Sequence, residues 1–376
     1  MKILEICPFS AGICGVFARV KEESLRLKEK GHEVKIFSSN LEKGTNKIAS
    51  ETDIIKDIEI TRFPAKRLGG ESFMSWNFES ALLDYNPNII IAHSYRHLHT
   101  TRALKLAKKI GAKIFLVTHA PFARNRSFLQ SIIVSIYDNT IGRATINKFD
   151  NVIAITKWEL PYLKAIGLKE NKISYIPNGI PEEFFEQKAE KNKKTKEKET
   201  KIIFLGRISP IKSLETIIKA FHLIKNKSIT LEIVGPAEPA YLEYLKSLIS
   251  KLNLQKQITF SPAIYDLKEK IEKIDSCDIF ILPSITEGMP QSLIETMARG
   301  KIVIASNNLA SKDIIKDNKN GFLFKVKDES DLADKINKIL NTNRKTLDNI
   351  RTNAKDSVKQ FSWDKIINQL ENLITK

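Results

Sequence analysis

The chain has 376 residues, with 61 Lys and Arg side chains against 44 Asp and Glu, so its formal net charge is +17. Hydrophobic residues make up 42% of the sequence and charged residues 28%, which excludes a natively disordered chain. At about 100–200 residues per domain, this length predicts two domains, each with its own core. The three cysteines, Cys7, Cys14 and Cys277, are too widely spaced for a disulfide framework or a zinc knuckle, and they favour a reducing compartment.

Apolar runs in the sequence are too short to cross a membrane. The longest, residues 88–92 and 279–282, fall far below the roughly 20 residues that a spanning helix needs. The first residues, MKILEICP, carry an acid in their middle and end at a proline, so they predict a buried strand and not a secretory signal. We therefore expect a cytoplasmic protein.

The first half of the chain alternates short apolar runs with segments of helical period. Strands are expected at residues 2–6, 33–37, 89–92, 114–117 and 152–155, and helices at residues 18–30 and 100–110. Each helix is followed by a glycine, Gly31 or Gly111, as is common at helix C-termini. Short apolar strands that alternate with helices predict a parallel sheet with helices on both faces.

The second half repeats this pattern. Strands are expected at residues 201–204, 231–234, 258–260, 279–282 and 302–305, and helices at residues 213–224, 240–251, 267–274, 292–298 and 330–340. The predicted fold class is therefore α/β, with two Rossmann-like parallel-sheet domains. Ligands of such sheets bind beyond the carboxyl ends of the strands, so we expect the two domains to face each other across a cleft that holds the active site.

Composition suggests the domain boundaries. We assign residues 1–185 to an N-terminal domain and residues 202–360 to a C-terminal domain. Residues 186–201 are almost entirely charged or polar and predict a solvated linker or loop. Residues 361–376 predict a last apolar-periodic helix that closes the fold and crosses back to the N-terminal domain.

Positive charge is concentrated between residues 101 and 150, which contain nine basic and two acidic side chains. Arg124 and Arg126 lie there in an expected loop, just before the apolar stretch 128–136. A basic loop beside an amphipathic segment fits an anionic membrane surface or a lipid phosphate. Lysine-rich, solvated helix faces are the alternative explanation. Nucleic acid is not expected as a partner, because the sequence has no recognised nucleic-acid-binding module.

Two basic residues follow the first strand of the second domain. In the segment Gly206-Arg207-Ile208-Ser209-Pro210-Ile211-Lys212, Arg207 and Lys212 lie between a strand end and a helix N-terminus. Backbone N–H groups and the helix dipole favour an anion at such a place. Arg binds phosphate oxygens with a planar fork, and Lys adds a mobile point charge. The pair therefore predicts a phosphate-binding site.

Two acidic residues follow a later strand of the same domain. Glu287 lies in the loop after residues 279–282, and Glu295 lies eight residues further on, inside the helix expected at 292–298. Carboxylates placed in this way can accept hydrogen bonds from the vicinal hydroxyls of a sugar. The turn between them is expected to present the backbone N–H groups of Gly288 and Met289 at the helix start.

Taken in order along the chain, these motifs resemble those of the retaining glycosyltransferases of family 4, which have the GT-B fold. Glu287 and Glu295 are similar to the family's signature of two glutamates separated by seven residues, and Gly206-Arg207 with Lys212 is similar to its phosphate-binding pair. The resemblance extends over nearly the whole chain and includes residues 31–34, 176–180, 297–301 and 320–323.

The resemblance implies a role for each matching residue. Arg207 and Lys212 would hold the diphosphate of a nucleotide-sugar and stabilise the charge that develops as it leaves. Glu287 would bind the hydroxyls of the donor sugar, and Glu295 those of the ribose. The implied catalytic residues are His119, Glu287, Arg207 and Lys212, and the implied nucleotide-sugar-binding residues are Gly15, Arg207, Lys212, Gly288, Met289 and Glu295.

Two residues of this set, Gly15 and His119, lie in the first domain. Gly15 corresponds to a glycine pair of the family that lets the backbone approach the phosphate. His119 follows the strand at 114–117 and corresponds to a histidine near the transferred sugar. The chain departs from the family pattern where glycine is common, at Cys14, Ser213, Pro262 and Ala310-Ser311.

The resemblance also implies an activity. The enzyme would move a hexose from a nucleotide-diphosphate sugar to a hydroxyl of a glycan, glycolipid or lipid-linked acceptor in cell-surface glycan assembly, with retention of anomeric configuration. The N-terminal domain would bind the acceptor, through loops 68–77 and 120–142, and the C-terminal domain would bind the donor. We expect a cytoplasmic location, peripheral on the inner face of the membrane.

No metal or other cofactor is expected, because the sequence has no Asp-x-Asp motif and no His and Cys cluster at ligand spacing. Two other function classes stay open at this point. A sugar-nucleotide epimerase of the same fold is disfavoured by the paired glutamates with Arg207 and Lys212. A non-enzymatic polyanion- or membrane-binding protein is suggested by the net charge of +17.

Overall fold

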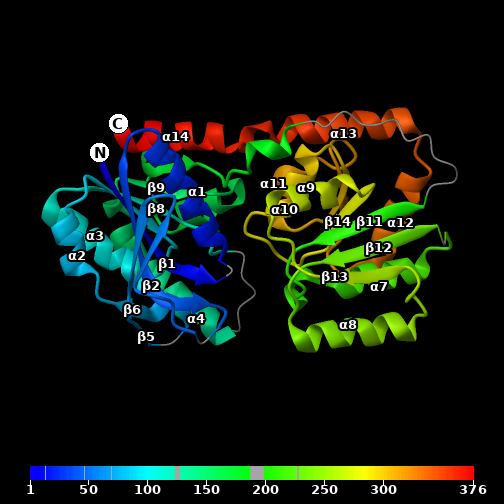
Figure 1. Ribbon diagram of the computed structural model, residues 1–376, viewed down its shortest axis with the longest axis horizontal. Coiled ribbons are helices and arrows are strands. Elements are labelled where there is room, and N and C mark those ends of the chain that lie inside the picture. Colours follow the sequence, from blue (N-terminus) through cyan, green and yellow to red (C-terminus); the bar gives the residue numbers. More distant parts are fainter. Residues whose placement is uncertain (13, 46, 69, 123–127, 187–198, 227) are drawn as a thin grey trace. The chain divides into compact units, whose positions relative to one another are not determined.

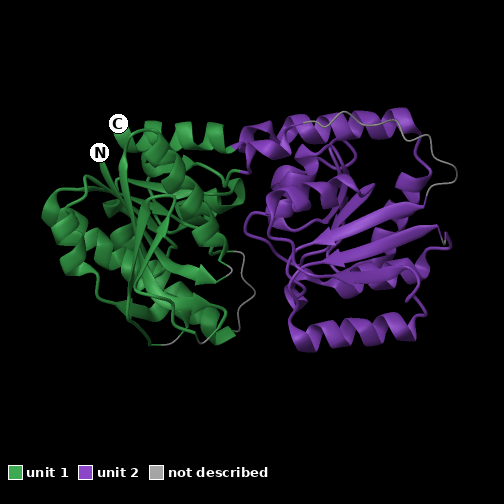
Figure 2. Cartoon of the chain, viewed as in Figure 1, with its two compact units in different colours: residues 1–179, 363–376 green, residues 180–362 purple. Residues whose placement is uncertain are grey.

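The computed structural model describes residues 1–376 with the exception of residues 13, 46, 69, 123–127, 187–198 and 227. The chain divides into two compact units (Figure 2). Unit 1 comprises Met1–Gly179 together with Trp363–Lys376, and unit 2 comprises Ile180–Ser362. Each unit has its own hydrophobic core around a largely parallel sheet.

Unit 1 is built on an eight-stranded sheet with the order β10-β9-β8-β7-β1-β2-β4-β3 (Figure 1). Neighbouring strands run parallel except β3 and β4, which pair antiparallel at the sheet edge. The strands are β1 (Lys2–Gly12), β2 (Glu33–Lys43), β3 (Thr52–Ile55), β4 (Ile58–Phe63), β7 (Ile89–His93), β8 (Lys113–Val117), β9 (Asn151–Ala154) and β10 (Ile173–Tyr175), with a separate hairpin of β5 (Ala65–Arg67) and β6 (Met74–Trp76).

The helices of unit 1 lie between its strands along the chain, except α14, which follows unit 2. They are α1 (Gly15–Glu29), α2 (Glu79–Tyr85), α3 (Leu98–Ile110), α4 (Phe128–Tyr137), α5 (Arg143–Thr145), α6 (Leu160–Ala165) and α14 (Trp363–Thr375). The central strands β1 and β7 are buried on both faces, as their almost wholly apolar sequences require.

The C-terminal helix α14 belongs to unit 1, as the sequence predicts. The ring of Trp363 lies against Gly179, where an added Cβ would come within 2.4 Å of the indole. This close approach explains why glycine stands at that position. Further along α14, Glu371 forms an ion pair of 2.7 Å with Lys30 and lies 3.3 Å from the ring of His32. These contacts connect α14 to the C-terminal end of α1 and to the turn before β2.

Unit 2 is built on a six-stranded parallel sheet with the order β13-β12-β11-β14-β15-β16. Its strands are β11 (Thr200–Leu205), β12 (Ile229–Val234), β13 (Ile258–Ser261), β14 (Ile279–Leu282), β15 (Ile302–Ser306) and β16 (Phe322–Phe324). Its helices are α7 (Leu214–Leu223), α8 (Pro239–Lys251), α9 (Leu267–Asp275), α10 (Gln291–Ala298), α11 (Leu309–Ile314), α12 (Glu329–Leu340) and α13 (Arg344–Val358).

The predicted fold class is confirmed: the chain is α/β, with two Rossmann-like domains. The elements that sequence patterns did not predict are short or weakly apolar. Strand β3 is exposed along most of its length, and α13 buries only Ile350, Ala354 and Val358. Most of the predicted linker 186–201 lies outside the described residues, and β11 begins at Thr200.

Each sheet has one point at which the strand order reverses. In unit 2 the chain runs outward from β11 to β13 on one side and from β14 to β16 on the other, so the reversal lies between β11 and β14. In unit 1 it lies between β1 and β7. Because the loops on the two sides of such a point diverge, they leave a crevice beyond the strand ends in which α/β proteins bind ligands.

Candidate active site

A cavity of about 300 Å³ lies at the reversal point of unit 2. Its lining includes Gly206 and Lys212 from the loop after β11, Glu287 and Met289 from the loop after β14, and Lys270 from α9. Residues from the two predicted loops therefore share one cavity. The polar and charged groups lie at the N-terminus of α10, which begins at Gln291.

Lys212 and Glu287 form a hydrogen-bonded ion pair in this cavity. Their side chains are only 18% and 13% exposed, so water screens the pair weakly. Two further contacts hold it in place. Ser284 Oγ donates a hydrogen bond of 2.6 Å to Glu287 Oε1, and the backbone N–H of Ile285 donates to the carbonyl oxygen of Ile211 at 2.9 Å. The second bond ties the two loops together directly before the charged residues.

The backbone of Ser284 is itself held by groups from the next strand. The carbonyl oxygen of Ser284 accepts hydrogen bonds from Ser306 Oγ and, at 3.0 Å, from Asn308 Nδ2. All three residues are buried. These hydrogen bonds fix the backbone of the loop before Glu287 and so hold its carboxylate at the cavity.

Glu295 is paired with a residue that sequence reasoning missed. Its carboxylate lies 2.6 Å from Lys270 Nζ, and Glu295 is 6% exposed. Lys270 is one of several lysines in α9, and nothing in the spacing marks it; its neighbour Lys273 pairs with Glu232 instead, at 2.8 Å. Only the fold, which places Lys270 beside Glu295 and Lys273 beside Glu232, distinguishes the two.

The other predicted residues of unit 2 lie near the cavity. Arg207 is 64% exposed, does not line the cavity, and lies 3.7 Å from the carboxylate of Glu238. Gly288 lies in the turn between the cavity residues Glu287 and Met289. Ser213, which replaces a frequent glycine, has φ of 51°. This left-handed conformation costs an L-residue roughly 1 kcal/mol, which explains the preference for glycine there.

In unit 1, His119 follows the carboxyl end of β8 in a constrained loop. His119 and Ala120 both have positive φ, 59° and 51°. The buried carboxylate of Glu159 holds this loop: its Oε1 accepts hydrogen bonds from Thr118 Oγ1 at 2.5 Å and from the backbone N–H of Ala120 at 2.9 Å. Two consecutive left-handed residues persist only where surrounding structure fixes them, and they are frequent at functional sites.

The ring of His119 is hydrogen-bonded into the interior of unit 1. Its Nε2 lies 2.9 Å from Nδ1 of His93, and Nε2 of His93 lies 2.6 Å from Oε2 of Glu5. Burial lowers the pKa of His119 well below its usual range and lowers the pKa of His93 to about 3, while burial raises the pKa of Glu5. All three groups lie at or beside the reversal point of the sheet.

Gly15 opens α1, directly after Cys14, and a Cβ there would meet no described atom within 4 Å. The backbone at this helix start is therefore sterically open. Gly15 and His119 belong to unit 1, whereas Arg207, Lys212, Glu287, Gly288, Met289 and Glu295 belong to unit 2.

Comparison with known proteins identifies the family. A sequence model described as Glycosyltransferase Family 4 matches residues 13–184, and one described as Glycosyl transferases group 1 matches residues 185–357. An uncharacterized glycosyltransferase of Methanocaldococcus jannaschii is 30% identical over 286 residues, which cover 73% of this chain and 70% of that protein. The chain belongs to glycosyltransferase family 4.

Two further relatives of this glycosyltransferase extend the comparison. The Campylobacter jejuni N,N'-diacetylbacillosaminyl-diphospho-undecaprenol alpha-1,3-N-acetylgalactosaminyltransferase is 25% identical over 290 residues, covering 73% of this chain and 74% of that protein. The structure of Anabaena HepE in complex with UDP matches all of both chains with a TM-score of 0.79 at 17% identity. At that identity the likeness establishes the fold, which is GT-B.

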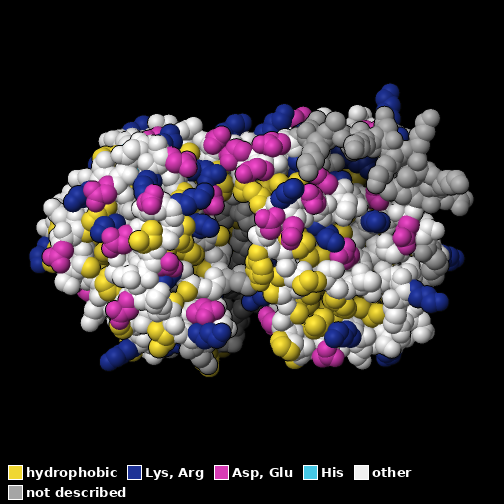
Figure 3. All heavy atoms as spheres, viewed as in Figure 1, with side chains coloured by type: hydrophobic (Ala, Val, Ile, Leu, Met, Phe, Trp, Pro, Cys, Tyr) yellow, Lys and Arg dark blue, Asp and Glu magenta, His cyan; other side chains and the backbone are white. Residues whose placement is uncertain are grey.

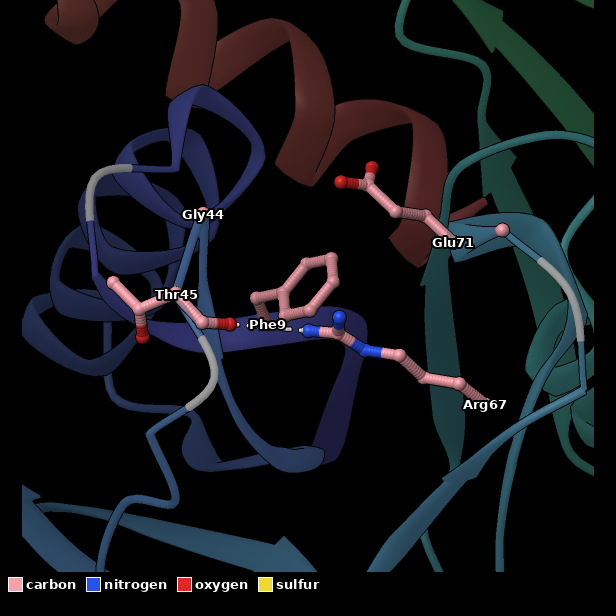
Figure 4. A pocket seen from close by; sticks show the side chains of 6 residues that line it. Phe9, Gly44, Thr45, Arg67 and Glu71 are labelled. Carbon is pink, nitrogen blue, oxygen red and sulfur yellow. Dashed lines mark hydrogen bonds between the residues drawn. The ribbon is translucent and has the colours of Figure 1, made fainter. Parts of the chain in front are cut away.

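The glycosyltransferase has a second cavity, of about 440 Å³, in unit 1 (Figure 4). Phe9 from β1 forms its floor, and Arg67 reaches across it to donate a hydrogen bond of 3.2 Å to the carbonyl oxygen of Thr45. Glu71 approaches from another side and pairs with Lys43. The cavity includes Glu71 of the predicted acceptor loop 68–77 and is lined by the last part of β1 and by the residues that follow β2.

The predicted basic loop with Arg124 and Arg126 lies outside the described residues, but the apolar stretch after it is described. It forms α4, whose residues Phe128, Leu129, Ile132, Ile133 and Ile136 are 41–80% exposed. They recur at helical spacing and form one apolar stripe. None of the described helices has the length and apolar character that crossing a membrane requires.

Proposed function

We propose that this family 4 glycosyltransferase moves a hexose from a nucleotide-diphosphate sugar to a hydroxyl of a glycan or lipid-linked acceptor, with retention of configuration and without a metal ion. The observation that carries the proposal is the cavity at the reversal point of unit 2, into which Lys212 and Glu287 are brought as a hydrogen-bonded pair. One cavity thus offers a cation for a diphosphate and a carboxylate for sugar hydroxyls.

Donor binding would exchange partners within this cavity. Lys212 would leave Glu287 for phosphate oxygens, and Glu287 would then accept hydrogen bonds from the donor sugar. Lys270 and Glu295 would separate in the same way, with Lys270 moving to the phosphate oxygens of the donor and the ribose hydroxyls donating to Glu295. Each carboxylate and each ammonium keeps a partner throughout, so the donor is bound without leaving a buried charge unpaired. The cationic groups then stabilise the leaving diphosphate as its charge develops.

The donor can be identified by its effect on stability. A ligand that binds only the folded protein raises the midpoint of thermal unfolding. We expect one of the UDP-, GDP- or ADP-sugars to raise it, and the matching nucleoside diphosphate to raise it less. If no nucleotide-sugar changed the midpoint at millimolar concentration, the donor site assigned to unit 2 would be wrong.

Transfer is tested by incubating this donor with and without an acceptor. A glycosyltransferase forms a new glycoside only when the acceptor is present, whereas an epimerase converts the sugar of the donor alone. The anomeric proton coupling of the product reports retention or inversion. Addition of EDTA is expected to leave the rate unchanged, and a complete loss of transfer would contradict metal independence.

The acceptor is proposed to bind unit 1 at the cavity that Phe9 and Arg67 line. The exposed apolar stripe of α4 supports a lipid-linked acceptor and a peripheral position on the cytoplasmic face of the membrane. The name of the Campylobacter relative, which specifies an undecaprenol-linked acceptor, supports the same class. Nucleic acid is disfavoured, because on the face drawn in Figure 3 the basic side chains of each unit are scattered among acidic ones.

Membrane binding can be measured with vesicles of phosphatidylglycerol and of phosphatidylcholine. A Leu129→Ser and Ile133→Ser double variant is expected to lose most binding to the anionic vesicles, since it removes two of the exposed apolar side chains of α4. Ile54→Ser is the matched control, because Ile54 is a comparably exposed isoleucine of unit 1 on β3. Equal loss in both variants would contradict a role for α4.

A further inference from the structure

Unit 1 contains a line of hydrogen-bonded ionisable groups for which the function proposed above does not account. Glu5 Oε2 lies 2.6 Å from His93 Nε2, and His93 Nδ1 lies 2.9 Å from His119 Nε2. Glu5 and His93 are completely buried, whereas His119 is partly exposed at the carboxyl end of β8. Only the last member of the line is therefore able to touch a ligand.

The surroundings of Glu5 favour its neutral, protonated form. Arg19 of α1, the nearest cation, is already paired with Glu23: its Nε donates to Glu23 Oε1 at 2.9 Å. The other oxygen of Glu5, Oε1, is buried and has no hydrogen-bond partner among the described residues. A buried carboxylate with one unpaired oxygen would cost several kcal/mol, whereas a neutral acid leaves only a carbonyl oxygen unpaired.

A proton on Glu5 determines where the protons lie on both rings. The acid O–H at Oε2 donates to Nε2 of His93, so the single N–H of a neutral His93 ring is at Nδ1. That N–H donates to Nε2 of His119, and the N–H of a neutral His119 ring is then at Nδ1. Burial keeps the pKa of both histidines low, so both rings are neutral near pH 7. Among the described residues, none is hydrogen-bonded to Nδ1 of His119.

We propose that Glu5 and His93 are positioning residues that fix His119 in the Nδ1–H tautomer, so that His119 presents Nδ1–H at the carboxyl end of β8 as a hydrogen-bond donor to a sugar hydroxyl of a bound substrate. The role of the sugar rests on the proposed function; the tautomer is a property of the protein without substrate. Glu159 completes the arrangement, because it fixes the backbone on both sides of His119 through Thr118 and Ala120.

A metal ion is the alternative occupant of this region, since side-chain atoms of Glu5, Glu23 and His93 lie within 4.8 Å of one another. The guanidinium of Arg19 already supplies positive charge to this cluster through Glu23. A divalent cation bound by these atoms would lie beside the buried guanidinium of Arg19, and placing two positive charges close together in the interior is costly. The geometry therefore favours a proton over a metal ion.

The tautomer can be measured directly by two-bond ¹H–¹⁵N correlation spectra of the ¹⁵N-histidine-labelled protein, with His93→Asn and His119→Asn used for assignment. We expect His119 to show a protonated Nδ1 and an unprotonated Nε2 in the absence of substrate. A protonated Nε2 at His119 would overturn the proposal. A shift of the His93 signals on dialysis against EDTA would also overturn it, because it would identify a bound metal.

Two substitutions of Glu5 test its role in catalysis. Glu5→Gln keeps an N–H donor next to His93, whereas Glu5→Met has a similar volume and no donor. For Glu5→Met we expect a mixture of tautomers at His119 and a kcat lowered by about tenfold, the cost of one hydrogen bond, with KM for the donor changed less than about threefold. Glu5→Gln is expected to retain the tautomer and at least about a third of the kcat.

Ser24→Ala, a change of another buried polar group on α1, is the control for general effects of altering this core. Wild-type kcat in Glu5→Met, or equal losses in Glu5→Gln and Glu5→Met, would overturn the proposal. If Glu5→Met did not fold, the spectrum of the wild-type protein would still decide. Absence of transfer with every donor, together with an Nδ1–H tautomer, would refute the proposed function alone; an active enzyme with an Nε2–H tautomer would refute only the present inference.

Discussion

The two units place charged side chains at the same topological point of their sheets but use them differently. In unit 2, between β11 and β14, Lys212 and Glu287 lie at the edge of a cavity and neutralise each other. In unit 1, between β1 and β7, Glu5 and His93 are buried beneath the strand ends, and only His119 reaches the surface.

The difference follows from what covers the strand ends. In unit 2 a cavity remains there, so an incoming ligand can take over the partners of the ion pair that lines it. In unit 1 Glu5 and its neighbours Arg19 and Glu23 of α1 are all buried, and Arg19 and Glu23 are paired with each other. Substitution of a charged group whose partner a ligand replaces is expected to change activity. Substitution of a charged group that keeps its partner is expected to change the position of neighbouring side chains and the stability of the fold.

The largest effect is expected from the ion pair of unit 2. Glu287→Gln and Lys212→Met should each lower kcat/KM by about 10²–10³, because each removes a group that interacts with the donor as charge develops. The midpoint of thermal unfolding should fall while the fold is retained, since each variant leaves the other charge of a partly buried pair without its partner. Transfer rates and unfolding midpoints, measured on the same preparations, check both statements.

Arg344→Ala is the control for this prediction, because Arg344 is an exposed basic residue of unit 2 that lies 3.7 Å from Asp348. It should leave transfer unchanged. Rates within threefold of wild type in either Glu287→Gln or Lys212→Met would show that the cavity at the reversal point is not the donor site.

The next largest effect is expected from a buried carboxylate of unit 1 that touches no proposed ligand. Glu159 accepts hydrogen bonds from Thr118 and Ala120, and its second oxygen accepts from the backbone N–H groups of Ile155 and Thr156 at 3.0 Å. Glu159→Ala leaves these donors unpaired and should lower the free energy of unfolding by about 2–4 kcal/mol. Denaturant titration followed by circular dichroism measures this loss.

Glu170→Ala, which removes an exposed glutamate of the same unit, should leave the denaturation midpoint unchanged. If Glu159→Ala were as stable as wild type, the left-handed pair His119 and Ala120 would have to be held by other contacts. In that case Glu159→Ala should also have little effect on the rate of transfer. Stability and transfer rate, measured together, distinguish a residue that supports the loop from one that takes part in the reaction.

Sequence patterns were informative where a residue's role depends on its place along the chain. Lys212 and Glu287 follow strands, and a parallel sheet brings strand ends together, so their meeting could be predicted from the fold class. The parallel pairing of β11 with β14 confirms that step. Apolar periodicity likewise predicted most strands and helices of unit 2, and in unit 1 the strands β1, β2, β7, β8 and β9 with the helices α1, α3 and α14.

Patterns were uninformative where a role depends on the direction of a side chain across the fold. Lys270 and Lys273 are equivalent in the sequence of α9, and only packing assigns one to Glu295 and the other to Glu232. Glu5 lies in an apolar strand, where an acid reads as an interruption of the pattern. Its partner His93 is 88 residues away, and no local signal connects them.

A smaller effect, on donor affinity, is expected from one of the two lysines of α9. Lys270→Ala removes the partner of Glu295 in the donor cavity and should weaken donor binding by about tenfold, equivalent to one charge-assisted hydrogen bond. Lys273→Ala is the matched control on the same helix, since its partner Glu232 does not line the cavity. Calorimetric titration with the donor measures both, and equal affinities in the two variants would exclude Lys270 from the site.

The smallest effect is expected from substitution of Glu371, whose ion pair with Lys30 connects α14 to the rest of unit 1. The hydrogen bond from Lys30 holds the pKa of Glu371 below its usual range. An acid whose pKa is lower in the folded state stabilises the fold above its unfolded pKa and loses that contribution as the pH falls through the folded value. Glu371→Gln should therefore cost less than about 1 kcal/mol at pH 7, because the pair is partly exposed, and the difference from wild type should vanish once the pH is below the folded pKa and should shrink in high salt. A cost that persisted in acid and in high salt would mean that the Glu371 side chain stabilises the fold by a contact other than its ion pair with Lys30.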